Sequence, residues 1–543
     1  NGKYTKNLPL FEGTHIFKAN PIVIEKLKAQ KKLLFNGELV HSYPHSWRSK
    51  APLVHRATPQ WFISMESHGL RKKALKALDD TTFYPDKGRE RIKAMIETRP
   101  DWCVSRQRVW GVPLPIFVHK TTKEILADDE VNENIASIYE KEGSDCWFSD
   151  DPQRFLGNKY KAEDYDKISD IVEVWFDSGC THAFVLEKRE DLQWPASMYL
   201  EGSDQHRGWF HSSLLESCGT RGRAPYESVL SHGFVVDGKG LKMSKSVGNV
   251  IAPEDILKKY GADILRIWVA SSNYAEDLRI DYSILEQHAD SYRKIRNTFR
   301  YLLGNLNDDF KKVDVEKLDL CQLPELEQYM LHRLYNLNEN FKNYFKTYDF
   351  HNLYKELLNF CTVDLSAFYF DIRKDALYCD AKDSDRRKSS ITVLNIILES
   401  LIKWFAPILS FTTEEIFILI NKDKKSIHLE KFMEFPKSFE NVKLNKKWTE
   451  LKKIRDICNI SIEAKRASKE IGSSLEANLT INLNKNLYEI TNNIDFSELC
   501  ITSLVTVEKS NIEEIIVKTN KAEGNKCPVC WKINKQKCER HSS

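Results

Sequence analysis

The spacing of apolar residues changes at about residue 285, and the two parts of the chain predict different structures. Before this point, short apolar runs alternate with amphipathic stretches. The apolar runs predict strands over 113–118, 171–175, 197–200, 229–230 and 234–236. The amphipathic stretches predict helices over 21–32, 89–98 and 205–218, and another that begins at Pro253. Strands separated by helices favour a parallel, doubly wound sheet, in which ligands bind at the carboxyl ends of the strands.

After residue 285 the apolar spacing is that of helices. Helices are expected over 292–303, 325–346, 350–370 and 385–405. A capping box, Thr412-x-x-Glu415, predicts the start of another. Together they indicate an all-α bundle of about 150 residues. A Lys-rich helix over 446–471 and an alternating strand over 479–483 follow.

Composition adds five observations to this picture. The 543 residues are enough for three or four domains, and a formal net charge of +3 indicates no class of partner. Twelve cysteines, most of them isolated, are typical of reduced thiols in a cytosolic protein. The longest apolar stretch, 391–411, is interrupted by Asn395, Glu399 and Lys403, which indicates a buried helix and no membrane span. The acidic segment 119–167 is expected to be a loop-rich insertion.

The run Lys242-Met-Ser-Lys-Ser246 is the first candidate for chemistry. Lysine ammoniums and serine hydroxyls suit phosphate oxygens, and nearby glycines let the backbone approach a phosphate chain. The spacing is not that of a Walker A loop. A solvated basic turn is the alternative that these residues alone leave open.

Two further clusters are open to either a functional or a structural interpretation. The segment 201–209 (Glu-Gly-Ser-Asp-Gln-His-Arg-Gly-Trp) follows a predicted strand, so it indicates a ligand pocket or a charged turn before a helix. Arg106 lies among Trp102, Arg108 and Trp110 in a second polar and aromatic cluster. His206 is an acid–base candidate, although a lone histidine is more often structural.

The C-terminal end contains a pattern of metal ligands. Cys527 and Cys530 are separated by two residues, and Cys538 and His541 by two more. Four such ligands suit a closed, tetrahedral structural Zn²⁺ site, and the alternative is four unrelated residues in a tail. Six Lys or Arg residues against two Glu over 521–543, with Trp531 for stacking, would suit RNA.

Several longer segments resemble the class I aminoacyl-tRNA synthetases. Lys242-Met-Ser-Lys-Ser246 resembles the second signature of that family. Residues 101–111 (Asp-Trp-Cys-Val-Ser-Arg-Gln-Arg-Val-Trp-Gly) look like the segment that follows the editing domain in the isoleucine, leucine and valine subgroup. Residues 174–179 and 199–210 are most similar to isoleucine-specific members. Further similarity at 293–298, 348–351, 406–411 and 471–477 extends the resemblance over nearly the whole chain.

The resemblance implies an isoleucine–tRNA ligase, which activates L-isoleucine with ATP to Ile-AMP and transfers it to tRNA(Ile). Lys242 and Lys245 are the implied catalytic residues, since with Mg²⁺ they would neutralise the triphosphate as pyrophosphate leaves. The residues implied to bind ATP or the adenylate are Glu201, Gly233, Phe234, Lys242, Met243, Ser244, Lys245 and Ser246. Those implied to bind the amino acid are Trp175, Asp204, Gln205 and Trp209. One structural Zn²⁺ per chain is implied at Cys527, Cys530, Cys538 and His541.

The implied fold is multidomain α/β plus α. It comprises the second half of a Rossmann-like parallel-sheet catalytic domain, an all-α anticodon-binding bundle and a small C-terminal α+β and zinc module. The implied divisions are 1–40 (tail of an inserted editing domain), 41–285 (C-terminal half of the catalytic domain, with the insertion at about 119–167), 286–440 (helical anticodon-binding domain), 441–520 (C-terminal junction domain) and 521–543 (zinc knuckle).

The sequence departs from the family in two places. The first signature, of the His-x-Gly-His type, is absent. We therefore expect the C-terminal part of a longer enzyme, inactive without its N-terminal half. Many relatives have a further zinc site where this chain has Ser46 and Ser49, so no metal is expected there. We expect a cytoplasmic monomer; a valine- or leucine-specific relative and a non-catalytic tRNA-binding protein are the alternatives.

Overall fold

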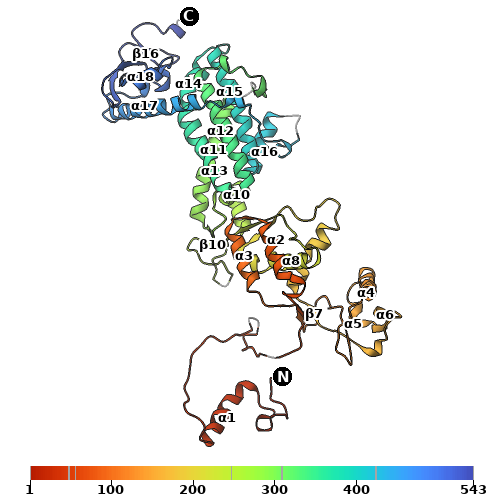
Figure 1. Ribbon diagram of the computed structural model, residues 1–543. Coiled ribbons are helices and arrows are strands. Elements are labelled where there is room, and N and C mark those ends of the chain that lie inside the picture. The colour runs from red at the N-terminus through yellow and green to blue at the C-terminus, as the bar shows by residue number, and fades with distance from the viewer. Residues whose placement is uncertain are drawn as a thin grey trace. The chain divides into compact units, whose positions relative to one another are not determined.

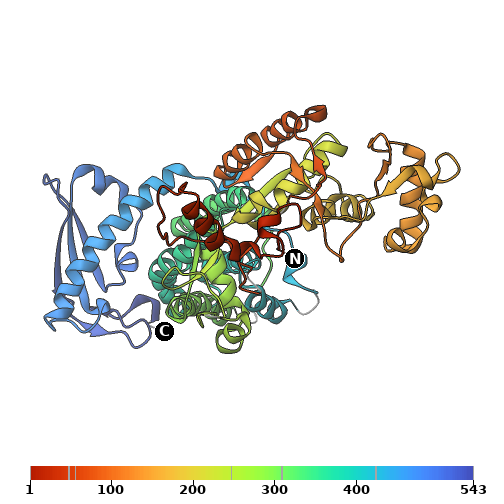
Figure 2. The same cartoon turned by 90° about the horizontal axis from the view of Figure 1, so that it is seen from below.

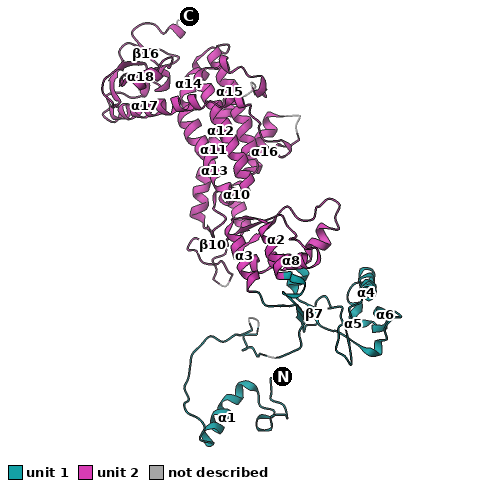
Figure 3. Ribbon diagram, in the orientation of Figure 1, with its two compact units in different colours: residues 1–70, 99–178 teal, residues 71–98, 179–543 magenta. Residues whose placement is uncertain are grey.

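The computed structural model describes residues 2–46, 49–55, 57–245, 247–306, 310–421 and 425–541. The chain forms two compact units, one of residues 1–70 and 99–178 and the other of residues 71–98 and 179–543 (Figure 3). Each unit is therefore built from two separate stretches of sequence. The predicted domain divisions stay predictions.

The first unit contains short antiparallel ladders. β1 (Phe62–Ile63) pairs with β3 (Trp102–Cys103), and β4 (Ser105–Arg106) pairs with β7 (Ile171–Val172). The strand predicted over 171–175 is wrong in its second half, because α7 (Val174–Gly179) begins there. The backbone carbonyl of Glu173 accepts hydrogen bonds from the amides of residues 176 and 177, which turns the chain into the helix.

The N-terminal helix of this unit, α1, spans Ile16–Ala29 and begins five residues before the predicted start. Pro21 lies inside the helix. The His15 side chain accepts a hydrogen bond from the Phe17 amide, so the helix is capped upstream of the proline that suggested its beginning.

The acidic segment has its own core and is not loop-rich. It contains α4 (Asp129–Glu142), α5 (Cys146–Ser149) and α6 (Pro152–Leu156) between the paired strands β5 (Phe117–His119) and β6 (Tyr165–Lys167). Trp147 is fully buried among Phe117 and Phe155, with ring centroids 5.0 Å from each. The aromatic residues of the acidic segment therefore supply the apolar area that holds these short helices together.

The second unit contains the predicted parallel sheet. Its strands lie in the order β2 (Thr82–Tyr84), β9 (Ser228–His232) and β8 (Tyr199–Gly202), and all are parallel. β10 (Val235–Asp237) and β11 (Leu278–Ile280) form a second parallel pair. α2 (Leu70–Asp79), α3 (Lys87–Glu97) and α8 (Trp209–Thr220) accompany the sheet (Figure 1). This confirms the α/β part of the fold, and the predicted strands at 197–200, 229–230 and 234–236 correspond to β8, β9 and β10.

The predicted helical bundle follows, and its helices share one large apolar core. They are α11 (Tyr282–Leu306), α12 (Glu325–Thr347), α13 (Phe350–Asn359), the π-helical η9 (Phe360–Phe370), α14 (Asp371–Cys379), α15 (Asp385–Phe405) and α16 (Ser410–Ile420). The capping box at Thr412 is wrong, because α16 begins at Ser410. Thr412 is buried, and its amide and hydroxyl donate to the Asp263 carboxylate, at 2.8 and 2.6 Å.

None of the helices in the described ranges has the length and apolar character needed to cross a membrane. Beyond the bundle, α17 (Val442–Ala467) packs across a three-stranded sheet of order β13-β12-β14 (Figure 2). Its strands are β12 (Ala477–Leu483), β13 (Leu504–Lys509) and β14 (Ile516–Lys521). β12 contains the predicted strand at 479–483, and its burial alternates along its whole length.

Candidate functional site

The carboxyl ends of β8 and β9 lie side by side, and they place an acidic residue at the edge of the parallel sheet. In the pairing of these strands, Glu201 is opposite Ser231 and Gly202 is opposite His232. The Glu201 side chain is exposed, and so is that of Asp204 in the short helix η5 (Ser203–Arg207). Two carboxylates are therefore accessible where a parallel sheet binds its ligands.

Trp209 and Gln205 are fixed at the start of α8. The Trp209 indole stacks on the buried ring of Tyr199, with centroids 4.0 Å apart and planes at 5°. The Gln205 side-chain oxygen accepts a hydrogen bond from the Trp209 amide at 2.9 Å, and its amide nitrogen donates to Asp204 at 3.2 Å. Gln205 thus caps the helix, as the charged-turn interpretation expected. The half-buried face of Trp209 forms a rigid wall beside the sheet end.

His206 has the surroundings of a structural histidine. It is 1% exposed, and its Nδ1 lies 2.7 Å from the Ser203 carbonyl. Burial lowers its pKa, which favours the neutral imidazole. A Cβ added to Gly88 would lie 2.9 Å from its Nε2, so α3 also packs closely against the ring.

The connection between β9 and β10 packs directly on another backbone segment. The Gly233 amide donates to the Tyr274 carbonyl at 2.9 Å, and a Cβ at Gly233 would lie 2.2 Å from the Glu276 carbonyl oxygen. The next amide, that of Phe234, donates to the Asp277 carboxylate at 2.8 Å. Only glycine therefore fits at position 233, and the Phe234 ring remains 47% exposed.

The lysine-rich run begins five residues after β10. Lys242 and Lys245 are exposed, and within the described ranges neither forms an ion pair that would neutralise it. Met243 packs against the core between them. The two ammoniums are therefore held by an anchored loop and are available to an anion. Ser246 lies outside the described residues.

The remaining predicted amino-acid-binding residue, Trp175, belongs to the first unit. It lies on α7 and is 42% exposed. The structure thus brings together Asp204, Gln205 and Trp209 in the second unit, and it describes Trp175 separately. Sequence reasoning missed Tyr199, the stacking partner of Trp209; its position ten residues earlier, in a predicted strand, gave no signal of this contact.

Of the predicted polar and aromatic cluster, Trp102 and Arg106 form a structural assembly within the first unit, whereas Arg108 and Trp110 are exposed. The Trp102 indole nitrogen donates to Glu173 Oε1 at 2.5 Å, and Arg106 pairs with Glu173 Oε2 at 2.8 Å. Glu173 is only 8% exposed. Its carboxylate is satisfied by these two partners, so the cluster explains how β4 and β7 are held together.

The C-terminal cysteines and histidine converge as the spacing predicted. The ligand atoms of Cys527, Cys530, Cys538 and His541 all lie within 4.8 Å of one another. The Cys530 and Cys538 sulfurs are 3.9 Å apart, and each of Cys527 and Cys538 lies 3.4 Å from His541 Nδ1. Tetrahedral Zn²⁺ with Zn–S bonds of about 2.3 Å would place two sulfurs about 3.8 Å apart. The four residues therefore fit zinc.

The environment of the cluster prepares it for a metal. Hydrogen bonds from the Cys530 and Val529 amides lower the pKa of the Cys527 thiol to about 6, which favours the thiolate ligand. His541 Nε2 lies 2.9 Å from the Cys379 carbonyl. A carbonyl can only accept, so Nε2 carries the proton and Nδ1 presents its lone pair to the sulfurs.

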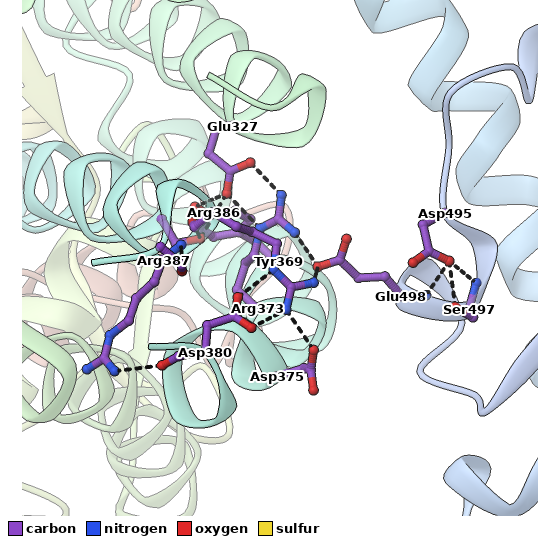
Figure 4. Close-up of polar contacts among 12 residues, drawn as sticks. Glu327, Tyr369, Arg373, Asp375, Asp380, Arg386, Arg387, Asp495, Ser497 and Glu498 are labelled. Atoms are coloured by element: carbon purple, nitrogen blue, oxygen red, sulfur yellow. Dashed lines mark hydrogen bonds and ion pairs between the residues drawn. The ribbon is translucent and has the colours of Figure 1, made fainter. Parts of the chain in front are cut away.

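A network of arginines and acids connects the bundle with the C-terminal sheet domain (Figure 4), and it continues to the metal module through Arg540. Arg373 on α14 binds Glu327 on α12 and, at 2.6 Å, Glu498 on α19 (Phe496–Leu499). Arg386 on α15 also binds Glu498, at 2.9 Å. The last link is Arg540, next to the metal ligand His541; like Arg386, it binds Asp375 and Asp380.

Comparison with known families identifies two regions of the chain. Residues 14–281 match the family described as tRNA synthetases class I (I, L, M and V). Residues 327–481 match the anticodon-binding domain of tRNA ligase. The first region contains the sheet end and the lysine loop, and the second contains most of the helical bundle.

Similar proteins agree with these matches. The isoleucine–tRNA ligase of Pelagibacter ubique is 90% identical over 542 residues, which is all of this chain and 60% of that protein. That of Brucella abortus is 48% identical over 531 residues, covering 95% of this chain and 54% of its own length. Among solved structures, Mycobacterium tuberculosis methionyl-tRNA synthetase bound by methionyl-adenylate superposes with a TM-score of 0.50 at 16% identity, over 70% of this chain and 66% of that one. That structural likeness concerns the fold alone, whereas the sequence matches extend over both units: the chain belongs to the class I tRNA synthetases.

Proposed function

We propose that this chain carries the pyrophosphate side of the adenylation site and the tRNA-binding part of an isoleucine–tRNA ligase. The chain spans about 60% of the length of the 90% identical relative, which is itself named an isoleucine–tRNA ligase. The observation that supports the proposal most directly is the lysine loop. It presents two exposed ammoniums that form no ion pair within the described ranges, and it follows β10 in the same unit as the sheet end that carries Glu201.

In the proposed reaction the isoleucine carboxylate attacks the α-phosphate of ATP, the bond to the bridging oxygen breaks, and pyrophosphate leaves. Lys242 and Lys245 stabilise the charge that develops on the pyrophosphate, and Mg²⁺ bound with ATP contributes further positive charge. Glu201 contacts the aminoacyl-adenylate. This arrangement needs positioning and charge and no covalent intermediate on the protein.

The ligand contacts of the proposal follow the geometry of the second unit. Trp209 offers a flat apolar face to the isoleucine side chain, with Gln205 and Asp204 beside it. Trp175, in the first unit, is proposed as a further residue that binds the amino acid. Gly233 and Phe234 lie near the adenosine, since they follow the carboxyl end of β9 and the phenylalanine ring is exposed. Met243, Ser244 and Ser246 complete the contacts of the loop with ATP.

The bundle is proposed to bind the anticodon stem and loop of tRNA(Ile). Lys294, Arg296 and Arg300 are exposed on α11, where they can contact phosphates. One structural Zn²⁺ at Cys527, Cys530, Cys538 and His541 would hold the C-terminal module in shape for that contact. We further propose a cytoplasmic monomer, consistent with cysteines that are free in the structure.

The test uses this chain joined to the preceding residues of the Pelagibacter relative, assayed by isoleucine-dependent ATP–pyrophosphate exchange. Lys245→Ala should lower kcat by roughly a hundredfold, the loss typical when one group that stabilises transition-state charge is removed. Isoleucine binding should stay unchanged. Lys258→Ala, an exposed lysine on α9 (Pro253–Tyr260), is the matched control. Normal exchange in Lys245→Ala would refute the assigned role.

The alternatives give different results in the same assay. A valine- or leucine-specific enzyme would show exchange with that amino acid and not with isoleucine. A non-catalytic tRNA-binding protein, which the match to an anticodon-binding domain would also allow, would show no exchange with any amino acid while retaining tRNA binding.

A further inference from the structure

The lysine loop is closed at its base by two polar side chains that the proposed function does not use, Asp237 and Asn249. Asp237 is the last residue of β10, and Asn249 lies just beyond the loop. The Asn249 amide nitrogen donates to Asp237 Oδ2 at 2.8 Å. The two ends of a segment of more than ten residues are therefore joined by one side-chain hydrogen bond.

Asp237 also organises the turn that precedes the lysines. Its Oδ1 accepts hydrogen bonds from the amides of Lys239 and Leu241, at 3.0 and 2.8 Å. The Asp237 amide donates to the Leu241 carbonyl, and Val236 forms an antiparallel bridge with Lys242. Gly240 has φ +81°, a value that favours glycine in this turn. The carboxylate thus uses one oxygen for the turn and the other for Asn249.

Asn249 in turn holds the backbone of the lysine-rich run itself. Its side-chain oxygen accepts from the Ser244 amide at 2.9 Å, and its nitrogen also donates to the Lys242 carbonyl at 3.3 Å. One carboxamide therefore bridges both sides of Met243, between the two lysines. The same hydrogen bond from Asn249 is the main reason that the pKa of Asp237 is lowered, so the acceptor is ionised at neutral pH.

We propose that Asp237 and Asn249 are positioning residues that form a clasp, which holds the lysine loop folded so that Lys242 and Lys245 face the leaving pyrophosphate. This inference rests on the proposed function for its catalytic consequence, although the clasp itself is a property of the folded chain. An amide is required at 249 because the position must accept from one backbone group and donate to another and to a carboxylate. Aspartate there would bring two carboxylates together, and alanine would release the loop.

The exchange of the two side chains gives a sharp test. Asn249→Asp places two carboxylates together, and Asp237→Asn places two amide nitrogens together. The double variant restores one donor facing one acceptor and keeps the acceptors for the Ser244 and Leu241 amides. It loses the bond to the Lys242 carbonyl and places a carboxylate oxygen beside that carbonyl, so its recovery is incomplete. The loop should therefore open more readily in each single variant than in the double variant.

The first measurement uses the 543-residue chain and limited trypsin digestion, which reports opening of the loop at Lys242 and Lys245. Cleavage there should be roughly tenfold or more faster in Asn249→Asp, Asn249→Ala and Asp237→Asn, since each loses at least two hydrogen bonds or gains a repulsion. Val247→Ala, an exposed loop residue, is the control and should be cleaved at the wild-type rate. Single variants that are cleaved at the wild-type rate would overturn the clasp. A double variant that is cleaved as fast as either single variant would also overturn it.

The second measurement is pyrophosphate exchange in the joined enzyme described above. The single variants should lower kcat by roughly tenfold or more and leave the KM for isoleucine within about twofold, because the amino-acid pocket is not touched. The double variant should recover most of the loss. If Lys245→Ala retains exchange, the proposed function fails while the digestion still decides the clasp. If Lys245→Ala is inactive but the clasp variants have wild-type kcat, the positioning role is overturned.

Discussion

The buried carboxylate of Glu327 belongs to the network in Figure 4, and its removal should loosen the packing of α12 against α14 within the bundle. Glu327 is fully buried and Arg373 is 2% exposed. The Glu327 Oε1 atom accepts from Arg373 Nε at 2.6 Å, from Tyr369 at 3.1 Å and from Ser390 at 3.2 Å. Glu327→Ala would remove these bonds together and leave a buried guanidinium.

The size of the effect follows from what Arg373 retains. Removing one partner of a buried ion pair costs about 3–5 kcal/mol, because the other charge stays desolvated. Arg373 keeps Glu498, 2.6 Å away and itself shared with Arg386, so we expect the lower end of that range. A cost of about 3 kcal/mol corresponds to a roughly hundredfold increase in the opening equilibrium of the helices that carry the pair.

Hydrogen exchange followed by mass spectrometry on the whole chain measures this opening locally. A local probe is needed because a chain of several domains does not unfold in one step. Amides of α12 and α14 should exchange roughly a hundredfold faster in Glu327→Ala. Lys374→Ala is the control, since it removes only an exposed pair with Asp371 on the same helix and should cost less than about 1 kcal/mol.

Replacing both members of the pair distinguishes a lost interaction from a damaged core. Glu327→Leu with Arg373→Met substitutes apolar residues for both charges. The amides of α12 and α14 should therefore be more protected from hydrogen exchange in this double variant than in Glu327→Ala. Unchanged protection from hydrogen exchange in Glu327→Ala would refute the idea that this pair stabilises the packing of α12 against α14. A double variant as damaged as the sum of its singles would refute the explanation through an unpaired charge.

Three further predictions concern the metal site, the insertion and the sheet end. Cys538→Ser should lower zinc content, measured by atomic absorption after dialysis, from about one per chain to none. Hydrogen bonds, led by that from Lys159, lower the pKa of Asp128 to about 2, so its contribution to stability is present above the unfolded value of about 4 and is lost as the pH falls from 4 to 2. Asp128→Asn should therefore unfold the insertion at lower temperature than wild type at pH 7 and at the same temperature at pH 2. Gly233→Ala should lower the melting temperature and slow ATP–pyrophosphate exchange in the joined enzyme, because the added Cβ would lie 2.2 Å from the Glu276 carbonyl oxygen.

The regular parts of the fold could be predicted because their signals are local. β8 and β9 contain short apolar runs followed by a polar residue, and each bundle helix repeats its apolar positions over several turns. β2, which is Thr-Phe-Tyr before Pro85, lacks such a run and was not predicted. One error arose where a contact distant in sequence decides the structure. Thr412 resembled an N-cap until Asp263, almost 150 residues earlier, proved to be its partner. The error at α1 is local, because His15 caps the helix upstream of the proline that suggested its beginning.

The candidate site likewise combines features that the sequence predicts with contacts that only the folded chain shows. The lysine loop and the sheet end are contiguous motifs, so the residue types alone suggested phosphate chemistry and a pocket. The stacking of Trp209 on Tyr199 needs the strand and the helix to be folded against each other. The clasp between Asp237 and Asn249 is intermediate: its residues flank the motif, but only the folded loop shows that both oxygens of the carboxylate are used.

At the metal centre, the ligand pattern identifies the donor residues but not the tautomer in which the histidine binds. The spacing of the cysteines and His541 identifies four donors, yet a neutral imidazole has two tautomers and only one leaves Nδ1 free for a metal. The choice is made by the Cys379 carbonyl, which lies 162 positions away and can accept a proton only from Nε2. A backbone carbonyl has no residue type, so no sequence motif could reveal it. The adjacent Arg540, bound to Asp375 and Asp380, keeps that carbonyl within reach. Docking of the module on α14 and metal binding therefore favour each other, because the same contact that holds His541 in place also selects its metal-binding tautomer.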